Sequence, residues 1–412
     1  MLLDFADLLS SDQFAQRARR PDCPAAFTRN GKLPLPALVA ALMSMRSGSQ
    51  QVSLDEFFAA TLGESAPVRG VSDRAFDKAR KKLHMPSLQW LNERLLDLAT
   101  RVHLIPLWCG FRVIAADGST LQPAVRACHR TRWAANPNQI FFGMYLPGAE
   151  LMLHASVHPS TFGERAMLIE ALEHLGPNDV LVLDRGYPAS WLIQFLIERG
   201  IRFVIRCDND SGWAAVRSFM RSNDMDTQTT LSPPSPDDAR AWDCACVAPT
   251  VRLVKSITPQ GKVRVMVTNL TPEQVPTAGF AELYHQRWRI EEAYKRLKHV
   301  LHLESVSGLS QQALIIDVAA KVLADNLASL MCLTAEKIHN MHARSRFCNR
   351  RYAARTLTRV LPSVLMMIGD VLLTIAGALA NLARNHCRHS PGRSTPRPSH
   401  HVKPHPRYAY KG

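Results

Sequence analysis

The chain has 412 residues, of which 46% are hydrophobic and 21% are charged. This composition excludes a disordered protein, and the length suffices for two or three domains with buried cores. The 50 Lys and Arg residues outnumber the 35 Asp and Glu residues, which gives a formal net charge of +15. Such an excess favours a polyanionic partner, most simply nucleic acid, although ribosome-bound and membrane-surface proteins share it.

Cysteine usage and hydropathy indicate where the chain works. Its nine cysteines include no Cys-x2-Cys pair, and the first residues show no secretory signal, which predicts a reducing cytoplasm. Cys244 and Cys246 form the closest pair, and because no further ligands accompany them we expect free thiols rather than a zinc site. The longest apolar stretch, residues 361–383, contains Asp370 and Asn381, so it predicts a packed helix and no membrane span.

The first part of the chain, residues 1–105, predicts a helical domain. Apolar residues recur at helical spacing in three segments, residues 35–45, 54–62 and 87–105. Basic residues gather between Arg17 and Arg46 and again between Arg74 and Lys82. We interpret this part as a DNA-end-binding domain; the alternative is that these charges only solvate the surface.

Residues 106–310 predict an α/β domain in which helices flank a sheet. The predicted strands, in chain order, are residues 111–116, 139–145, 150–157, 179–183 and 201–206. A helix is expected before the fourth strand, at residues 165–175, and another after it, at residues 188–199, where Pro188 suits the first turn. This order is typical of a ribonuclease-H-like core with a mixed five-stranded sheet.

Three further regions complete the predicted organisation. Residues 208–270 are polar and contain prolines, with two strand-like runs at 251–257 and 263–269, so we expect a β-rich insertion. Residues 311–383 predict a helical C-terminal region, with helices at 311–339 and 354–383. His, Pro, Arg and Ser dominate residues 384–412 without periodicity, which predicts a basic disordered tail.

Two aspartates follow predicted strands of the α/β domain. Asp117 follows the strand at residues 111–116, and Asp184 follows the strand at residues 179–183. Open α/β sheets usually place their chemistry at the carboxyl ends of strands, which makes both aspartates candidate catalytic residues. The alternative for each is a turn or helix-cap residue.

A third candidate carboxylate, Glu291, lies on a predicted helix. Rotation by about 100° per residue places it on one stripe with the side chains Tyr284, Arg287 and Lys298. Glu292 faces away from this stripe. An ordinary charged surface helix is the alternative interpretation.

Asp117, Asp184 and Glu291 would converge if the sheet closes in the predicted order. Carboxylate oxygens suit Mg²⁺ or Mn²⁺. Two such ions about 3.5 to 4 Å apart support an in-line phosphoryl displacement without a protein nucleophile. The three carboxylates therefore predict a two-metal nuclease site.

The motifs resemble those of a known family, the cut-and-paste DDE transposases of the insertion-sequence-four type. Tyr284, Arg287, Glu291 and Lys298 match its Tyr-x2-Arg-x3-Glu-x6-Lys signature at every spacing. Asp117-Gly118-Ser119 is similar to the first acidic motif of the family, and Asp184-Arg185-Gly186-Tyr187 is similar to the second. The resemblance covers roughly residues 30–310, and the four-residue signature is its most specific part.

The resemblance implies roles for these residues. Asp117, Asp184 and Glu291 would be the catalytic, metal-binding triad. Arg287 and Lys298 would hold phosphates near the scissile bond.

Aromatic residues are implied to contact the DNA end. Tyr284 and Trp288 are similar to residues that steady a terminal phosphate and stack on an extruded base, with a core aromatic as the alternative for Trp288. Trp242 is a candidate for a second stacking residue in the insertion.

The function implied is that of an insertion-sequence transposase. It would bind double-stranded DNA at terminal inverted repeats, cut the element ends by metal-dependent hydrolysis and join the 3′-hydroxyl ends to target DNA, with or without a hairpin intermediate. The resemblance also implies a homodimer in the synaptic complex and a cytoplasmic, nucleoid-associated location in a bacterium. The alternatives are a non-catalytic repressor derived from a transposase and a ribonuclease-H-fold nuclease without strand transfer.

Overall fold

The computed structural model describes residues 1–29, 31–45, 48–123, 138–207, 212–257, 261, 263–308 and 310–388. Most of the predicted tail, and Arg46 of the first basic cluster, lie outside the described residues. The chain forms two compact units. Unit 1 comprises Met1–Leu104, Thr120–Gln139 and Tyr294–Gly412, and unit 2 comprises Ile105–Ser119 and Ile140–Ala293.

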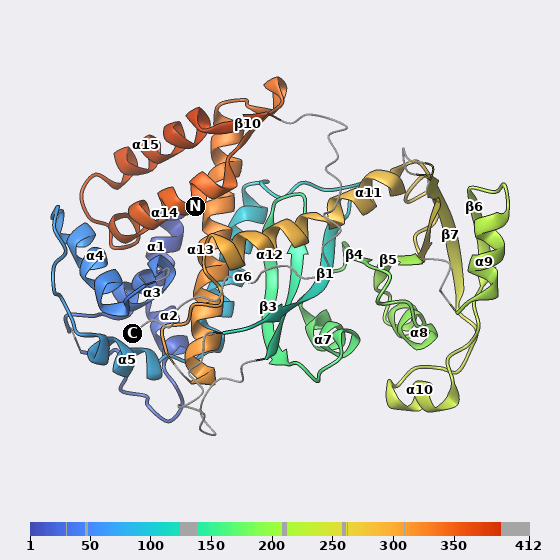
Figure 1. The fold of residues 1–412 in the computed structure, drawn as a ribbon, viewed down its shortest axis with the longest axis horizontal. Helices are drawn as coiled ribbons and strands as arrows, with labels where there is room; N and C mark the ends of the chain where they lie inside the picture. Colours follow the sequence, from blue (N-terminus) through green and yellow to red (C-terminus); the bar gives the residue numbers. More distant parts are fainter. Residues whose placement is uncertain are drawn as a thin grey trace. The chain divides into compact units, whose positions relative to one another are not determined.

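Unit 2 is built on a mixed sheet whose strand order is β3-β2-β1-β4-β5-β8-β7-β6 (Figure 1). Its strands are β1 Arg112–Leu121, β2 Gln139–Leu146, β3 Leu151–Pro159, β4 Asp179–Leu183, β5 Arg202–Cys207, β6 Asp226–Thr230, β7 Thr250–Ile257 and β8 Val263–Thr268. All five residues of β4 are buried, as expected of a parallel strand covered on both faces. The five strands predicted for the core are present, at the predicted places in the chain.

The sheet is larger than the five strands predicted. β8 pairs antiparallel with β5, from Val204 opposite Thr268 to Cys207 opposite Val265, and β7 and β6 follow beyond it. The strands of the predicted insertion therefore continue the core sheet. A free β5 edge would expose unpaired backbone groups, and β8 satisfies them.

Helices complete unit 2. They are α7 Glu164–Ala171, α8 Ser190–Glu198, α9 Ala214–Arg221, α10 Pro236–Ala241 and α11 Gly279–Arg287. The predicted helix at 165–175 ends in a short 3₁₀ turn, Leu172–His174. α11 packs on β4 and β7, where Phe280, Leu283 and Tyr284 join a buried cluster with Val180 and Val182. This packing fixes the helix that bears the first half of the four-residue signature.

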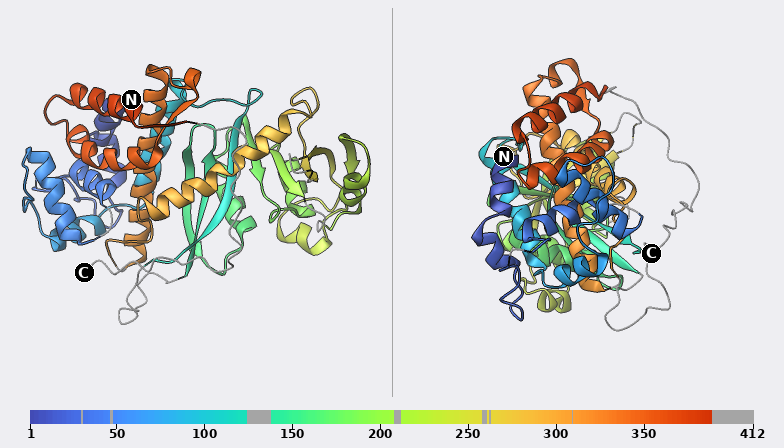
Figure 2. Two further views of the ribbon diagram at one scale, coloured as in Figure 1. Left: turned by 45° about the horizontal axis from the view of Figure 1, so that its top comes forward. Right: turned by 90° about the vertical axis from the view of Figure 1, so that its left-hand side faces the viewer.

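Unit 1 is helical and combines both ends of the chain. Its helices are α1 Leu2–Leu9, α2 Asp12–Ala18, α3 Leu35–Ser44, α4 Gln50–Leu62, α5 Asp73–Lys81, α6 Pro86–Arg101, α13 Gln311–Ile338, α14 Arg350–Leu365 and α15 Val371–Arg384. The short strands β9 Arg346–Cys348 and β10 His386–Arg388 pair beside them. α13 is buried along most of its 28 residues and contacts α3, α6, α14 and α15. The predicted N-terminal domain and the predicted helical C-terminal region thus lie together in one compact unit (Figure 2). The domain bounds given from the sequence stay a prediction.

The apolar stretch near the C-terminus is divided. A single helix was expected over residues 354–383, but α14 ends at Leu365 and α15 begins at Val371. Met367 and Gly369 between them have positive φ angles of 52° and 69°, a conformation that ends a helix. Within the part of the chain that the structure describes, no helix is long and apolar enough to cross a membrane.

Candidate active site

Asp117 and Asp184 lie at the same level of neighbouring parallel strands. β1 and β4 pair from Arg112 opposite Asp179 to Ala115 opposite Val182. Extending this register by two residues places Asp117 opposite Asp184, and adjacent strands lie about 4.8 Å apart. Side chains alternate along a strand, so both aspartates lie on the face that carries Val180 and Val182 and is covered by α11.

The prediction that Asp117 ends its strand was wrong in detail. β1 continues to Leu121, whereas its pairing with β4 stops at Ala115. Asp117 therefore lies within β1, two residues beyond the segment that pairs with β4. Asp184 directly follows the end of β4. The backbone N–H groups of Gly118 and Gly186 donate to Oδ1 of the nearby aspartate, at 3.0 and 2.7 Å, and orient both carboxylates.

The loop after β4 is held by an arginine. Nη2 of Arg165 in α7 donates to the carbonyl of Gly186 at 2.9 Å, and its Nε donates to the carbonyl of Tyr187 at 3.1 Å. These charge-assisted bonds fix the turn that presents Asp184.

The helix predicted to carry the signature is interrupted at Trp288. Tyr284 and Arg287 belong to α11, and Glu291 belongs to α12, which spans Arg289–His299. The N–H of Glu291 donates to the carbonyl of Trp288 at 3.1 Å across the break. Trp288 is 42% exposed, so the core position that was its alternative is excluded.

Arg287 connects the carboxylates from the strand and the helix. Its Nη1 lies 3.6 Å from Asp117 Oδ2, and its Nη2 lies 3.3 Å from Glu291 Oε1. Only 4% of Arg287 is exposed, yet its Nε and Nη1 find no hydrogen-bond acceptor among the described residues. Two buried donors are thus left for a further acceptor, such as a phosphate oxygen.

The carboxylates repel one another electrostatically. The pKa of Asp117 rises from 3.8 to about 7, because burial disfavours its charge and because Asp184, Glu164 and Glu291 repel it, while Arg287 opposes the rise. Burial and the charge of Asp184 also raise the pKa of Glu164. The structure therefore brings the predicted triad together with Arg287 and adds a fourth carboxylate.

Glu164 was missed by the sequence analysis. It is the first residue of α7, and a Cβ atom on Gly118 would lie 2.6 Å from its Oε1, so the glycine leaves room for the carboxylate. The signal available was the glycine after Asp117 together with an acidic residue opening the next helix.

Tyr187 was named in the second acidic motif but given no role. Its ring is fully buried, and its hydroxyl has no hydrogen-bond partner in the described ranges. Its pKa rises well above the usual value, through burial first and then the charges of Glu164, Asp117 and Asp184. The hydroxyl is therefore a protonated donor close to the carboxylates.

Tyr284 lies in the core rather than at a surface. Only 2% of it is exposed, and the guanidinium groups of Arg206, Arg264 and Arg287 lie 5.6 to 5.7 Å from the centre of its ring. This burial favours a role in supporting Arg287 over the direct phosphate contact implied by the resemblance.

Two further predicted residues, Lys298 and Trp242, have other contacts. Lys298, in unit 1, donates through Nζ to the carbonyl of Thr120 and lies 4.0 Å from Glu304. Trp242 stacks on Trp191 of α8, with ring centroids 4.2 Å apart. The phosphate and base contacts assigned to Lys298 and Trp242 stay predictions.

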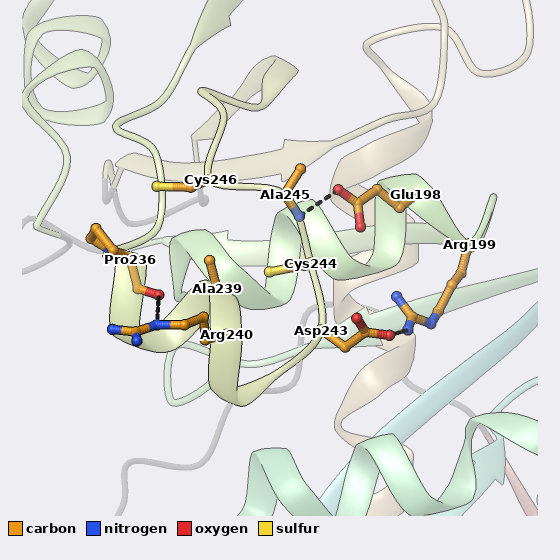
Figure 3. A pocket seen from close by; sticks show the side chains of 9 residues that line it. All are labelled: Glu198, Arg199, Pro236, Ala239, Arg240, Asp243, Cys244, Ala245 and Cys246. Atoms are coloured by element: carbon orange, nitrogen blue, oxygen red, sulfur yellow. Dashed lines mark hydrogen bonds and ion pairs between the residues drawn. The ribbon is translucent and has the colours of Figure 1, made fainter.

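A pocket of about 1040 Å³ lies beside Trp242 in unit 2 and contains none of the predicted site residues (Figure 3). Its polar groups pair with one another: Glu198 accepts from the N–H of Ala245 at 2.8 Å, and Arg199 lies 3.7 Å from Asp243. The candidate active site is therefore the carboxylate cluster.

The cluster fits a divalent cation chemically. Asp117, Asp184 and Glu291 offer only carboxylate oxygens, the ligands that Mg²⁺ and Mn²⁺ prefer, and their mutual repulsion is the kind that a cation relieves. Among the described residues no three His, Cys, Asp or Glu side chains are already arranged to hold an ion. Binding one would require the side chains to turn toward a common point.

Fold and site define an α/β protein in which an acidic cluster lies on adjacent strands and on the helix that covers them. Comparison with known proteins identifies the group. Residues 111–327 match the family described as the transposase DDE domain, and the chain belongs to that family. The resemblance based on the four-residue signature is thereby confirmed.

A relative and a solved structure are similar to this chain. Transposase InsG for insertion sequence element IS4, from Escherichia coli (strain K12), is 22% identical over 260 residues, which are 60% of this chain. The match spans 58% of the length of that relative. The piggyBac transposase synaptic complex with hairpin DNA aligns with a TM-score of 0.45 at 12% identity, over 95% of this chain and 87% of that one, a likeness too weak to define the fold.

Proposed function

We propose that this protein is the transposase of an insertion sequence. It binds the terminal inverted repeats of the element, hydrolyses the DNA at both ends and joins the resulting 3′-hydroxyl groups to target DNA. The observation that carries the proposal is the convergence of Asp117, Asp184 and Glu291 around Arg287, in a chain of the transposase DDE family.

We infer that the first five strands form a ribonuclease-H-like core. Their order, β3-β2-β1-β4-β5, with β1, β4 and β5 parallel, supports this inference. Such a core supplies the two neighbouring strands that carry Asp117 and Asp184 and the edge that β8 extends.

The triad would hold Mg²⁺ or Mn²⁺, as two ions. When bound, such ions stabilise charge on the entering and leaving oxygens of a phosphoryl transfer. The buried Nε and Nη1 groups of Arg287 would donate to oxygens of the scissile phosphate, and the ring of Tyr284 would keep the guanidinium in place. Tyr187 would donate its hydroxyl hydrogen to a carboxylate of the cluster and hold it in one orientation.

The DNA end would be gripped by other side chains. Trp288 is exposed at the break between α11 and α12, and it would stack on an extruded base if hairpins form. Lys298 would contact backbone phosphates after giving up its bond to Thr120.

The active assembly would be a homodimer that holds two element ends together, because both ends must be joined to one target. It would act in the bacterial cytoplasm, on the DNA of the nucleoid. The alternatives to this function are a non-catalytic repressor and a nuclease that cuts without joining.

One incubation separates these functions. The DNA that flanks the coding sequence supplies the inverted repeats, and the protein is mixed with them, a target plasmid and Mg²⁺. We expect cuts at both ends and joined products. Absence of cutting would leave the repressor, and cutting without joining would leave the plain nuclease.

A further inference from the structure

Helix α14 of unit 1 presents three arginines on one face. Arg351, Arg355 and Arg359 follow one another at intervals of four residues, and all three are exposed. We name them the arginine ridge. None of them has an ion-pair partner among the residues that the structure describes.

The ridge borders a groove of about 770 Å³ that lies within unit 1. The groove is also lined by α4, by His299 at the end of α12 and by His302 in the segment that follows. Glu56 is the one carboxylate among the described residues that line the groove. With three arginines against one carboxylate, the lining carries a net positive charge.

Within the described ranges no carboxylate forms an ion pair with the ridge. Like charges four residues apart on a helix repel one another. The three arginines are exposed, whereas Ala354 and Leu357 between them are buried. Charges that destabilise the free protein are expected where a ligand of opposite charge binds.

The spacing of the ridge fits a nucleic-acid backbone. A rise of about 1.5 Å per residue separates successive arginines by about 6 Å, so the three span about 12 Å. Over that length one strand of B-form DNA presents three or four phosphates, at about 3.4 Å each.

We propose that the arginine ridge and its groove bind the sugar-phosphate backbone of double-stranded DNA, as a binding surface additional to the carboxylate site. This inference rests on the proposed function, which makes DNA the substrate. Phosphate contacts of this kind fix position and orientation without reading sequence. Loss of the ridge therefore weakens binding to repeat and unrelated DNA alike.

The test is the salt dependence of DNA binding by the full chain. Fluorescence anisotropy measures the affinity for a repeat duplex and for an unrelated duplex at salt concentrations from about 50 to about 200 mM. Over this range each phosphate contact changes the affinity measurably. The variants are Arg351→Gln/Arg355→Gln/Arg359→Gln and the matching triple Lys substitution. The control is Arg199→Gln/Arg221→Gln/Arg240→Gln, which removes the same charge from exposed positions of unit 2.

The Gln variant of the ridge should reduce the slope of log affinity against log salt by about 2.7, since each phosphate contact contributes about 0.9. The Lys variant should keep most of the slope. The slope of the unit 2 control should fall by less than the amount that one phosphate contact contributes. The melting temperature of the Gln variant should equal or exceed that of the wild type, because repulsion within the ridge is relieved. A wild-type slope in the Gln variant, or an equal loss in the control, overturns the inference.

Failure of this inference differs from failure of the proposed function. If the wild type cuts repeat DNA while the Gln variant of the ridge keeps the wild-type slope, the groove is not the binding surface and the transposase function stands. If the wild type does not cut but the ridge variant loses slope, the groove binds DNA and the proposed function fails.

Discussion

The two charged regions of the molecule hold their charge in opposite ways. In unit 2 the carboxylate of Asp117 is mostly buried, and its pKa is raised by this burial and by the neighbouring acids Asp184, Glu164 and Glu291. In unit 1 the arginine ridge is exposed and lacks ion pairs among the described residues. A crowded acidic cluster is stabilised by protonation or by a cation, whereas an exposed basic ridge is stabilised by anions in solution. Under the proposed function, divalent metal ions would stabilise the acidic cluster and the DNA backbone would stabilise the ridge.

The largest expected effect is on cleavage, from Asp184→Asn. The amide keeps the shape of the side chain but removes the charge that would hold a cation, which costs several kcal/mol of transition-state stabilisation and about a thousandfold or more in rate. Binding of repeat DNA should stay within about threefold, since base and phosphate contacts lie elsewhere. Single-turnover cleavage and anisotropy on the same duplex measure the two effects. Cutting that survives the substitution would remove Asp184 from the triad.

The second effect is a change in the free energy of unfolding with pH, which we expect from the buried Asp117 and not from the exposed arginines. The folded pKa of Asp117 is about 7 against 3.8 ordinarily, so the folded state binds more protons and stability falls as pH rises between about 4 and 7. About three pKa units correspond to at most about 4 kcal/mol, less for a side chain that still touches solvent. The free energy of unfolding of Asp117→Asn, relative to that of the wild type, should therefore be higher at pH 8 than at pH 4.5, by on the order of 2 kcal/mol.

Denaturant unfolding at the two pH values measures this difference. Mg²⁺ should raise the stability of the wild type at pH 8 and leave Asp117→Asn nearly unchanged. An equal stability difference at both pH values would show that Asp117 is not crowded by other carboxylates.

A smaller effect on DNA cleavage is expected from substitution of Trp288, an exposed residue to which we assign base stacking. Removing an exposed side chain changes the free energy of unfolding by about 0.5 kcal/mol or less. If the ring stacks on an extruded base, Trp288→Ala costs about 1 to 3 kcal/mol in the step that distorts the DNA. A fluorescent base analogue at the element end reports that step. Equal analogue signals in variant and wild type would remove the stacking role.

The smallest effect is expected at Gly118. An added Cβ lies 2.6 Å from Oε1 of Glu164, so Gly118→Ala would push this carboxylate aside at little cost to folding, because only the end of a flexible side chain must move. We expect stability within about 1 kcal/mol of wild type and cleavage slowed about tenfold, since small misplacements of active-site groups reduce rates. Gly163→Ala, which meets no atom within 4 Å, is the control. An unchanged cleavage rate in Gly118→Ala would show that the position of the Glu164 carboxylate does not matter for catalysis.

Local patterns predicted the core elements well. The strand predicted at residues 179–183 is β4, because a fully buried apolar run bounded by polar residues leaves little choice. The helix expected from Pro188 begins two residues later, at Ser190, because Ala189 adopts an extended backbone. Extension of the sheet by β8 was not predictable, because its pairing with β5 joins residues about 60 positions apart.

The site was predicted as far as its motifs reach. Helical spacing placed Glu291 and Arg287 on one stripe and the family resemblance implied their roles; the structure joins them by an ion pair. Spacing could not reveal the break at Trp288, since no glycine or proline marks it, nor the burial of Tyr284 against β4. Glu164 was missed because the glycine after Asp117 and the acidic residue that opens the next helix are too weak a signal by themselves; the tertiary fold brings the two together.

The central claim is that one particular set of carboxylates cuts DNA, and two adjacent residues test it most directly. Glu291 pairs with Arg287, whereas its neighbour Glu292 is exposed and was predicted to face away. Single-turnover cleavage of repeat DNA in Mg²⁺ is measured for Glu291→Gln and Glu292→Gln. The proposed site predicts no detectable cutting by Glu291→Gln and a wild-type rate for Glu292→Gln. Normal cutting by Glu291→Gln would contradict it.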